Sequence, residues 1–278
     1  MPAMRSNSRR RQNRSDSRPA IVQMDWTLGQ WIDRPTEPVD EDTLEKVHQN
    51  ALRILEEIGI LFLNSEARDI LRGIGCEVDD VTENVRFDRA LVLDAIAKAP
   101  GRFTITPRNE DRQIILGDGH FLFSCVASTP NVSDLDGGRR VGNRPDYQNL
   151  LRLTQYFNCL HFNAGYPVEP VDIHASIRHL DCIYDMLTLT DKVVHAYALG
   201  SERIEDAMDM VRIAAGLTED EFQASPRMFT NINSTSPLKH DWPMLDGAMR
   251  AARRGQVVVV SPFTLSGAMA PATVMGAV

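Results

Sequence analysis

The stretch VVHAYALGSERIEDAMDMVRIAA, residues 193–215, holds one complete strand–helix unit and decides the fold. Its first seven residues are an apolar run that predicts a buried strand, and Gly200 separates this run from a helical pattern that begins at Ser201. Apolar strands that alternate with amphipathic helices are typical of consecutive βα units around a parallel sheet. The same alternation runs from Gly119 to the last residue, so we expect residues 119–278 to form one α/β domain.

The repeats of this unit can be placed along the chain. Strands are predicted at Phe121–Ala127, Cys159–Tyr166, Val193–Leu199, Met228–Asn233 and Val257–Ser261. Helices are predicted at Pro145–Phe157, Asp172–Leu189, Ser201–Ala215 and Asp241–Arg254. A further short helix is predicted to begin at Thr218, where Glu221 completes a capping box.

The spacing of the strands favours a barrel. Their centres advance by roughly 30–40 residues, which fits the eight-unit barrel better than an open doubly wound sheet. No G-x-G-x-x-G motif follows any strand, which disfavours a dinucleotide-binding sheet. We therefore expect a (β/α)8 TIM-type barrel that is incomplete, with about five βα units. An open half-barrel exposes an unpaired edge, so we expect an amino-terminal fragment of a longer protein.

Residues 37–118 have a different pattern and are expected to form an α+β appendage. Helical spacing predicts helices at Asp40–Ile58, at Ser65–Gly73 and at Asp88–Lys98, where Pro100 and Gly101 follow. Short apolar runs between and after these helices predict four strands, at Glu77–Val78, Val85–Phe87, Phe103–Thr106 and Gln113–Leu116.

The first residues carry an unusual charge. Residues 1–18 hold six arginines against one acid, Asp16, whereas the rest of the chain has 24 Lys and Arg against 37 Asp and Glu. A polar basic segment cannot bury enough apolar surface to order itself, so we expect residues 1–36 to be a disordered basic arm and lead-in. The acidic body would repel phosphate, which disfavours nucleic acid as a partner.

The sequence contains neither a membrane-spanning run nor a secretory signal, which predicts a cytoplasmic protein without a membrane partner. Its four cysteines form no C-x-x-C pair, so buried reduced thiols are expected. His174 and His179 are five residues apart, a spacing that does not place two metal ligands on one helical face. His161 and His195 lie singly on strands, where a core histidine is the commoner outcome. No metal site is predicted.

The working residues of such barrels lie at the carboxyl ends of the strands and in the loops that follow. Asn231 and Asn233 are two apart, so both amides lie on one face of a strand. They either point into the barrel mouth or cap the loop and the next helix. His195 and Tyr197 share a face in the same way. The full selection is Ser128, Thr129, Tyr166, Pro167, Tyr197, Asn231, Asn233, Ser234, Ser261, Phe263 and Thr264.

The segment after the last strand is rich in small residues. Residues 261–271, SPFTLSGAMAP, join a buried strand to a helix. Close backbone approach to a large flat ligand requires such small residues, and a plain tight turn uses them too. Periodicity does not separate the two interpretations.

Three stretches resemble the trimethylamine methyltransferase family, whose members include glycine betaine methyltransferases. They are ALRILEEIGI at residues 51–60, NINSTSPL at 231–238 and SPFTLSGAMAPAT at 261–273, and the resemblance spans residues 37–278. It implies a barrel enzyme that moves a methyl group from a quaternary or tertiary methylamine to the cobalt of a corrinoid held by a separate protein. The partners implied are this corrinoid protein and a small methylated amine, and we expect a homo-oligomer at full length.

Methyl transfer from a quaternary ammonium releases a neutral amine, so neither a Ser-His-Asp triad nor a strong general acid is required. The cation can be held by an aromatic cage, for which the candidates are Tyr166, Tyr197, Phe229, Trp242 and Phe263. A betaine carboxylate can accept hydrogen bonds from His195, Lys239, Asn231 or Asn233. The predicted substrate-binding residues are Tyr166, His195, Tyr197, Asn231, Asn233 and Phe263. The predicted corrinoid-contacting residues are Ser234, Ser261, Thr264 and Gly267.

Other functions remain open from the sequence. A metal-dependent lyase or hydrolase can use the same barrel. A protein that binds a betaine or a corrinoid without turnover would retain the same residues. The arginine-rich arm also leaves open an interaction protein.

Overall fold

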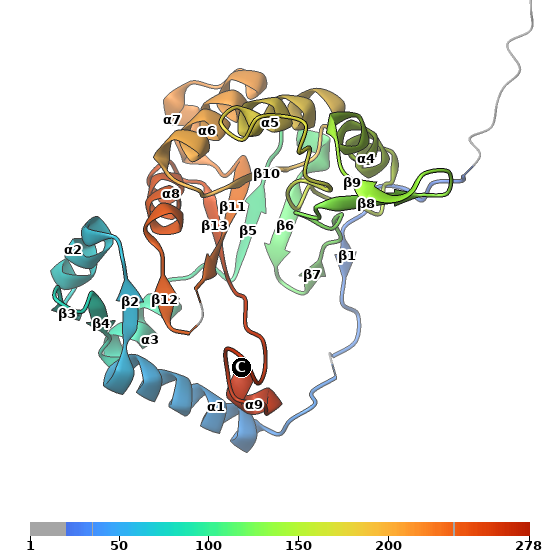
Figure 1. Cartoon of the computed structure of the whole chain (residues 1–278). Coiled ribbons are helices and arrows are strands. Elements are labelled where there is room, and N and C mark those ends of the chain that lie inside the picture. Colours follow the sequence, from blue (N-terminus) through green and yellow to red (C-terminus); the bar gives the residue numbers. More distant parts are fainter. Residues whose placement is uncertain (1–20, 35, 236) are drawn as a thin grey trace, which may run out of the picture.

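The computed structural model describes residues 21–34, 36–235 and 237–278 (Figure 1). The basic arm that the sequence predicts falls outside the described residues up to residue 20. Within the described ranges, no helix has the length and apolar character needed to cross a membrane.

The helices are α1 Glu41–Arg53, α2 Ser65–Gly73, α3 Arg89–Ala97, α4 Arg144–Tyr156, α5 Arg178–Leu189, α6 Ser201–Ala215, α7 Glu219–Ala224, α8 Trp242–Arg253 and α9 Val274–Ala277. A π-helical turn, Ile54–Ile58, extends α1, and a 3-10 turn, Glu110–Arg112, precedes β6. The strands are β1 Gly29–Gln30, β2 Ile60–Phe62, β3 Glu77–Asp79, β4 Asn84–Arg86, β5 Arg102–Ile105, β6 Ile114–Gly117, β7 His120–Phe121, β8 Asn131–Asp134, β9 Gly138–Val141, β10 Val194–Tyr197, β11 Met228–Ser234, β12 Lys239–His240 and β13 Val257–Pro262.

Most predicted helices are confirmed, because their capping residues act as the sequence suggests. The Asp40 carboxylate accepts the Thr43 N–H at the start of α1, and Asp88 caps α3 in the same way. Thr218 and Glu221 form the predicted capping box of α7. Local signals of this kind need no tertiary contact to act.

The predicted start of the helix at Asp172 is wrong, since α5 begins at Arg178. The Asp172 carboxylate accepts the backbone N–H of Arg144, 2.9 Å away in α4, and does not cap its own segment. Residues 171–177 therefore form turns between α4 and α5.

The centre of the structure is a parallel sheet in the order β10-β11-β13. Single parallel bridges join Val193 to Phe162 and Phe162 to Ser124. The five segments predicted as strands are therefore parallel neighbours in chain order. The sheets of the described residues are open, so the complete (β/α)8 barrel stays a prediction.

The first two predicted strands do not form continuous ladders. Only Ser124 and Phe162 bridge there, and the start of the first segment forms β7, which pairs antiparallel with β1. The Phe123 N–H is taken by the Nδ1 atom of His161 at 2.9 Å instead of a neighbouring carbonyl. A side chain thus replaces one rung of the ladder.

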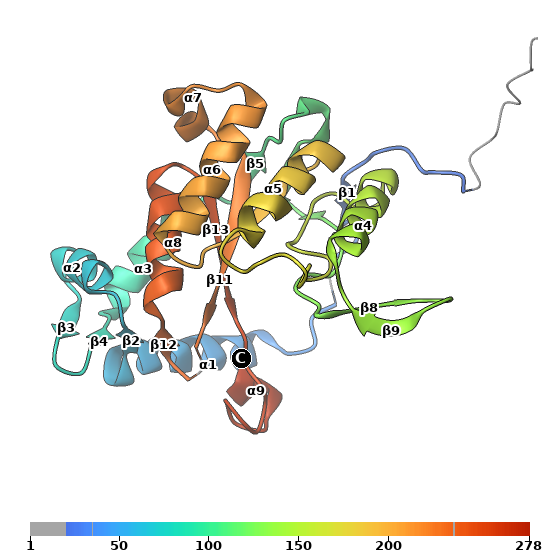
Figure 2. The same ribbon diagram turned by 45° about the horizontal axis from the view of Figure 1, so that its top comes forward.

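Helices cover one face of the parallel sheet, side by side in the order α4, α5, α6, α8 (Figure 2). The main core lies between them and the sheet, where Val194, Ala196 and Met228 point from the strands toward the helices. Tyr147 of α4, Met186 of α5 and Met208 of α6 are fully buried in this core. Burial of such side chains contributes about 1.5–3 kcal/mol each and fixes the position of the strands.

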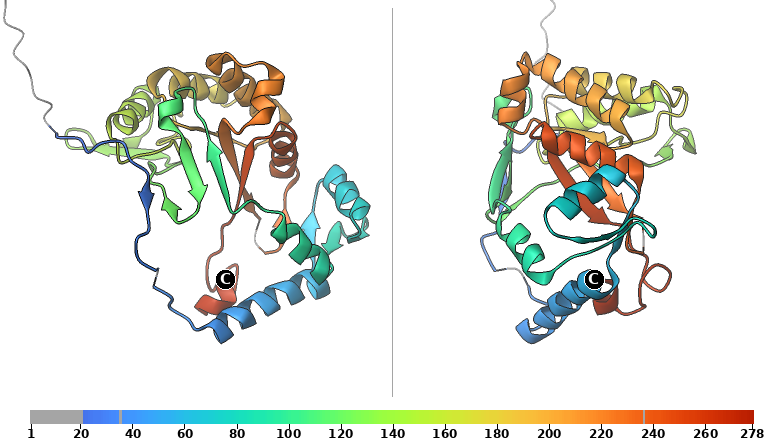
Figure 3. Two further views of the ribbon diagram at one scale, coloured as in Figure 1. Left: turned by 180° about the vertical axis from the view of Figure 1, so that it is seen from behind. Right: turned by 90° about the vertical axis from the view of Figure 1, so that its left-hand side faces the viewer.

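The opposite face of the sheet is covered only near the amino ends of the strands. The β5–β6 hairpin lies on this side (Figure 3), and its Ile105 and Ile114 pack with Val193. Trp26 and Leu28 of the lead-in join the same cluster. The carboxyl ends of the strands on this face remain uncovered by the hairpin.

A short strand from the loop after β11 joins a sheet of the appendage. A second sheet has the order β12-β2-β4-β3, in which β12 comes from the loop after β11 and pairs parallel with β2. The Leu61 N–H donates to the Leu238 carbonyl at 2.9 Å. The loop that contains the NINSTSPL motif is thereby held by the appendage. A β8–β9 hairpin, which the sequence did not predict, projects beside α4 (Figure 1).

Candidate functional site

A cavity of about 290 Å³ lies at the carboxyl ends of β10 and β11. We call it the strand-end cavity, and its side chains include His195, Tyr197, Phe229, Asn231, Asn233 and Met244. His195 lies opposite Phe229 in the parallel register, and Tyr197 lies opposite Asn231. Strand alternation puts these residues on the face away from the main core. The predicted residues His195, Tyr197, Asn231 and Asn233 are thus brought together.

His195 is an almost fully buried imidazole in the wall of the cavity. Its exposed fraction is 1%, and its ring lies 4.8 Å from the Tyr197 ring and 4.9 Å from the Phe229 ring. Burial lowers the pKa of His195 to about 4, so the ring is neutral near pH 7. Its Nδ1 atom is buried and has no hydrogen-bond partner within the described part of the chain. A buried polar atom left unpaired is uncommon and points to a ligand or an ordered water.

The two asparagines bind each other instead of capping the next helix. The Asn231 Nδ2 group donates to Asn233 Oδ1 at 3.0 Å, and the Asn233 N–H contacts the Met244 sulfur at 3.4 Å. Helix α8 is capped by the carboxylate of Asp241. The asparagine pair therefore does not cap α8.

Tyr197 forms the wall on one side of the strand-end cavity. Its hydroxyl is hydrogen-bonded to the Ser128 hydroxyl and accepts the Tyr166 N–H at 3.1 Å. A side chain at Gly165 would place its Cβ 2.5 Å from the Tyr197 oxygen, and the backbone there has a φ of +143°. Glycine is required at this position, because only it permits both the conformation and the close approach.

Tyr166 lies on the other side of Tyr197. The two rings meet edge to face at 4.8 Å, but Tyr166 belongs to the main core between sheet and helices. It does not line the strand-end cavity. The structure thus separates Tyr166 from the other predicted substrate-binding residues.

Two predicted aromatic residues lie outside the cavity. Phe263 follows the end of β13 and is 61% exposed, and Trp242 at the start of α8 is 48% exposed. Neither lines the strand-end cavity. Lys239 is in β12, where it pairs with the appendage.

The predicted corrinoid-contacting residues lie next to the cavity and beyond it. Ser261 is opposite Asn233 in the register. Ser234 and Thr264 line a second cavity of about 390 Å³ between these loops and the appendage. Gly267 is exposed and has a φ of +82°.

Met244 is a cavity residue that the sequence did not predict. Its position depends on α8 lying against the end of β10, where a Cβ at Gly247 would lie 2.8 Å from the Ala198 Cα. This close approach brings the first turn of α8 to the cavity. A glycine inside a predicted helix is a signal that could have indicated such packing.

The histidines give no support to a metal centre. His161 uses both ring nitrogens, since Nδ1 accepts the Phe123 N–H and Nε2 lies 3.1 Å from the Thr27 carbonyl. The prediction of a core histidine is confirmed for this residue. Among the described residues, no three His, Cys, Asp or Glu side chains are grouped so as to hold a metal.

Comparison with known proteins places this geometry in context. A family model described as trimethylamine methyltransferase (MTTB) matches residues 5–278. A glycine betaine methyltransferase of Desulfitobacterium hafniense is 33% identical over 236 residues, which are 85% of this chain and 49% of that protein. A trimethylamine methyltransferase of the same species is 26% identical over 238 residues, 85% of this chain and 47% of the relative. A proline betaine:corrinoid methyltransferase of Eubacterium limosum is 24% identical over 243 residues, 84% of this chain and 49% of the relative. The chain thus spans about half the length of these relatives.

Proposed function

Because this chain belongs to the trimethylamine methyltransferase family, we propose that the protein moves a methyl group from a quaternary or tertiary methylamine to the cobalt of a corrinoid on a separate protein. The name of the Eubacterium limosum relative includes a corrinoid, which supports the choice of acceptor. We further propose that the five parallel segments are the first part of a (β/α)8 barrel. Their parallel order along the chain supports this fold.

The observation that carries the proposal is the chemistry of the strand-end cavity. Its described lining contains rings, amides and a thioether, and no carboxylate or permanently charged base. A methylated ammonium has no hydrogen to donate, so it is held by aromatic faces, each worth about 0.5–2 kcal/mol. His195 is suitable as one wall because its low pKa keeps it neutral, and a neutral ring does not repel a cation.

The amides suit the other end of a betaine. Asn231 and Asn233 lie on the same strand face as Phe229. One amide hydrogen bond already joins them, and the amide groups have further N–H donors for a carboxylate. Because the asparagine pair is uncharged, it can hold the carboxylate by hydrogen bonds alone. The carboxylate then stays apart from the part of the cavity that holds the cation.

The loop after β13 leaves space for the approach of a large flat ring. A Cβ added at Gly267 would meet only the Ala272 Cβ, at 3.9 Å, and Ala268 is exposed. Ser261 lies opposite Asn233, and Ser234 and Thr264 line the neighbouring cavity of about 390 Å³, so these residues would hold the ring edge. The cobalt of the corrinoid supplies the nucleophile for methyl transfer. The residues of this chain bind the amine, orient it and exclude water.

The test uses the full-length protein and a corrinoid protein active with another methyltransferase. Trimethylamine, glycine betaine, proline betaine and carnitine are each supplied, and loss of substrate is measured together with the absorbance of the methylated corrinoid. We expect transfer from at least one of the four. Silence on all four would contradict the proposal, and binding without transfer would indicate a non-catalytic protein.

A pair of aromatic variants tests the cavity itself. Phe229→Ala removes a ring from the cavity wall and is expected to raise KM about tenfold, given the strength of one ring contact. Trp242→Ala removes an exposed ring outside the cavity and is the matched control. Equal effects of the two substitutions would place the substrate elsewhere.

A further inference from the structure

A third cavity, of about 350 Å³, lies on the opposite side of Tyr197, between the end of β10 and helices α5 and α6. We call it the helix-side cavity. Its polar side chains include Glu169, Arg178, His179, Arg203 and the two tyrosines Tyr166 and Tyr197. Unlike the strand-end cavity, it is lined by charged groups.

Two of these groups have carboxylate neighbours. Arg178 lies 3.6 Å from the Glu169 carboxylate and donates from Nε and Nη2 to the Ile173 carbonyl. The Nε2 atom of His179 is 2.8 Å from the carboxylate of Asp206. Burial raises the pKa of Glu169, which shows that its charge is poorly solvated.

Arg203 is the unmatched charge of the cavity. It is half-buried in the first turn of α6, and the described residues offer it neither a hydrogen bond nor an ion pair. Arg254, which is also half-buried, has carboxylate partners. A guanidinium removed partly from water without an anion is unfavourable, so the cavity has a surplus positive charge.

A second polar side chain that lines the cavity is almost fully buried. His179 is 9% exposed, and its Nδ1 atom is buried without a partner within the described residues. The amino end of α6 adds partial positive charge, because Gly200 provides no side-chain cap there. Arg203 and this helix end thus leave unused N–H donors around one space.

We propose that the helix-side cavity binds a small carboxylate, held by the Arg203 guanidinium beside the amino end of α6. This site is distinct from the strand-end cavity and goes beyond the proposed methyl transfer. A monoanion is favoured over a phosphate dianion, because the Glu169 carboxylate also lines the cavity and repels a second negative charge more strongly. A planar carboxylate also matches the fork of the guanidinium.

The experiment titrates acetate into the full-length protein by isothermal calorimetry, with phosphate and tetramethylammonium as comparison ligands. We expect acetate to bind. Arg203→Met should weaken its binding about tenfold or more, since a charge-assisted hydrogen bond is lost. Arg203→Lys should give an intermediate affinity because it keeps the charge and loses the fork.

Two further variants locate the site. Arg139→Met removes an exposed arginine on β9 and should leave acetate binding unchanged. Asn233→Ala alters the strand-end cavity and should leave the Arg203-dependent part of acetate binding unchanged. Melting temperatures near that of the unaltered protein would show that Arg203→Met still folds.

Several results would overturn the proposal. They are an absence of acetate binding, an equal affinity of the Arg203→Met variant, stronger binding of phosphate or tetramethylammonium, or a loss caused by Asn233→Ala alone. Methyl transfer in the Arg203→Met variant is measured separately, so the proposed function stands or fails independently of this site.

Discussion

The two ends of the same parallel strands are built differently. At the amino ends, Lys192, Arg254 and Gln256 form what we call the amino-edge cluster, in which each polar head group has several partners. The Lys192 amine donates to the carbonyls of Thr154 and Phe157. The Gln256 amide accepts from two backbone N–H groups and donates to two carbonyls.

At the carboxyl ends, polar groups remain unused. His195 Nδ1 has no partner among the described residues, and Asn231 and Asn233 bond mainly to each other. The contrast is not complete, since the Nε atom of Arg227 at the amino ends is also buried and unpaired. Satisfied groups stabilise the fold, whereas unsatisfied ones are available to a ligand. Substitutions at the two ends should therefore separate stability from activity.

The largest effect is expected from Lys192→Met in the amino-edge cluster. Although burial lowers the pKa of Lys192 to about 8, the amine is protonated at neutral pH and can donate to both carbonyls. Methionine would leave the buried Thr154 carbonyl unpaired and would leave the Phe157 carbonyl with only the Leu160 N–H, at a cost of about 4 kcal/mol in the free energy of unfolding. Urea denaturation measures the change, with Lys46→Met on the exposed side of α1 as control. A change in KM without a loss of stability would contradict the assignment of Lys192 to the stabilising end of the strands.

His195→Gln is expected to change stability only in acid. The folded pKa is about 4 and the usual value is 6.5. Between these values the unfolded chain binds a proton that the folded protein does not, so stability falls as pH decreases through this window. Each unit of pKa difference changes the free energy of unfolding by about 1.4 kcal/mol, so the unaltered protein should lose about 3 kcal/mol across this window. The His195→Gln variant should not show this loss. Urea midpoints between pH 7 and 4 test this, and the control is His48→Gln on α1. Parallel curves for His195→Gln and the unaltered protein would contradict a buried neutral ring.

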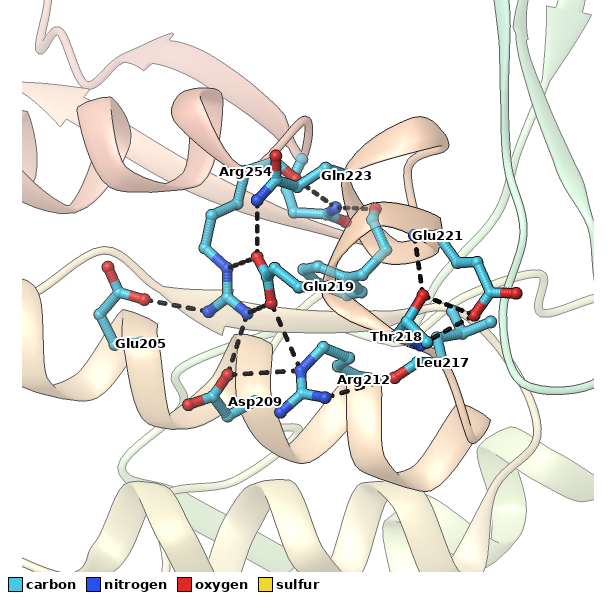
Figure 4. A network of polar contacts seen from close by, with 11 residues as sticks. Glu205, Asp209, Arg212, Leu217, Thr218, Glu219, Glu221, Gln223 and Arg254 are labelled. Carbon is cyan, nitrogen blue, oxygen red and sulfur yellow. Dashed lines mark hydrogen bonds and ion pairs between the residues drawn. The ribbon is translucent and has the colours of Figure 1, made fainter.

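A smaller effect is expected from Arg254→Met, whose side chain joins three helices at the amino ends (Figure 4). It binds Glu205 at 3.0 Å and Asp209 at 2.9 Å from α6, and Glu219 at 2.6 Å from α7. Its own exposed fraction is 13%, so its loss should lower stability by about 2 kcal/mol. The neighbouring Arg253→Met breaks one exposed pair with Glu66 and should cost about 0.5 kcal/mol. Equal losses of stability in the two variants would mean that the Arg254 network contributes no more than one exposed ion pair.

Comparison of sequence and structure shows which features are local. The helix predicted at Ser201–Ala215 has these bounds in the structure, because a glycine flanks each end. The start of α5 was missed because Asp172 bonds to a residue 28 positions away. The β8–β9 hairpin was missed because its strands are short and mostly polar.

The candidate site likewise divides into features with a local sequence signal and features set by distant contacts. Asn231 and Asn233 could be placed on one face because strand alternation is local. Tyr166 does not line the strand-end cavity, since it packs in the main core against α4 and α5. Met244 depends on the approach of α8 to β10. Neither contact leaves a periodic signal in the sequence.

The smallest effect, and the most specific one, is expected from Asn233→Ala at the carboxyl ends. The substitution removes one amide from the strand-end cavity and the acceptor of the Asn231 amide. Because the amides are proposed to bind a carboxylate, kcat/KM for glycine betaine should fall about tenfold, whereas trimethylamine, which has no carboxylate, should be affected less. Stability should change little, since Asn233 is only partly buried. Asn149→Ala on the exposed side of α4 is the control. Unchanged activity with every substrate would remove Asn233 from the site, and an equal loss with both substrates would assign it to the cation instead of the carboxylate.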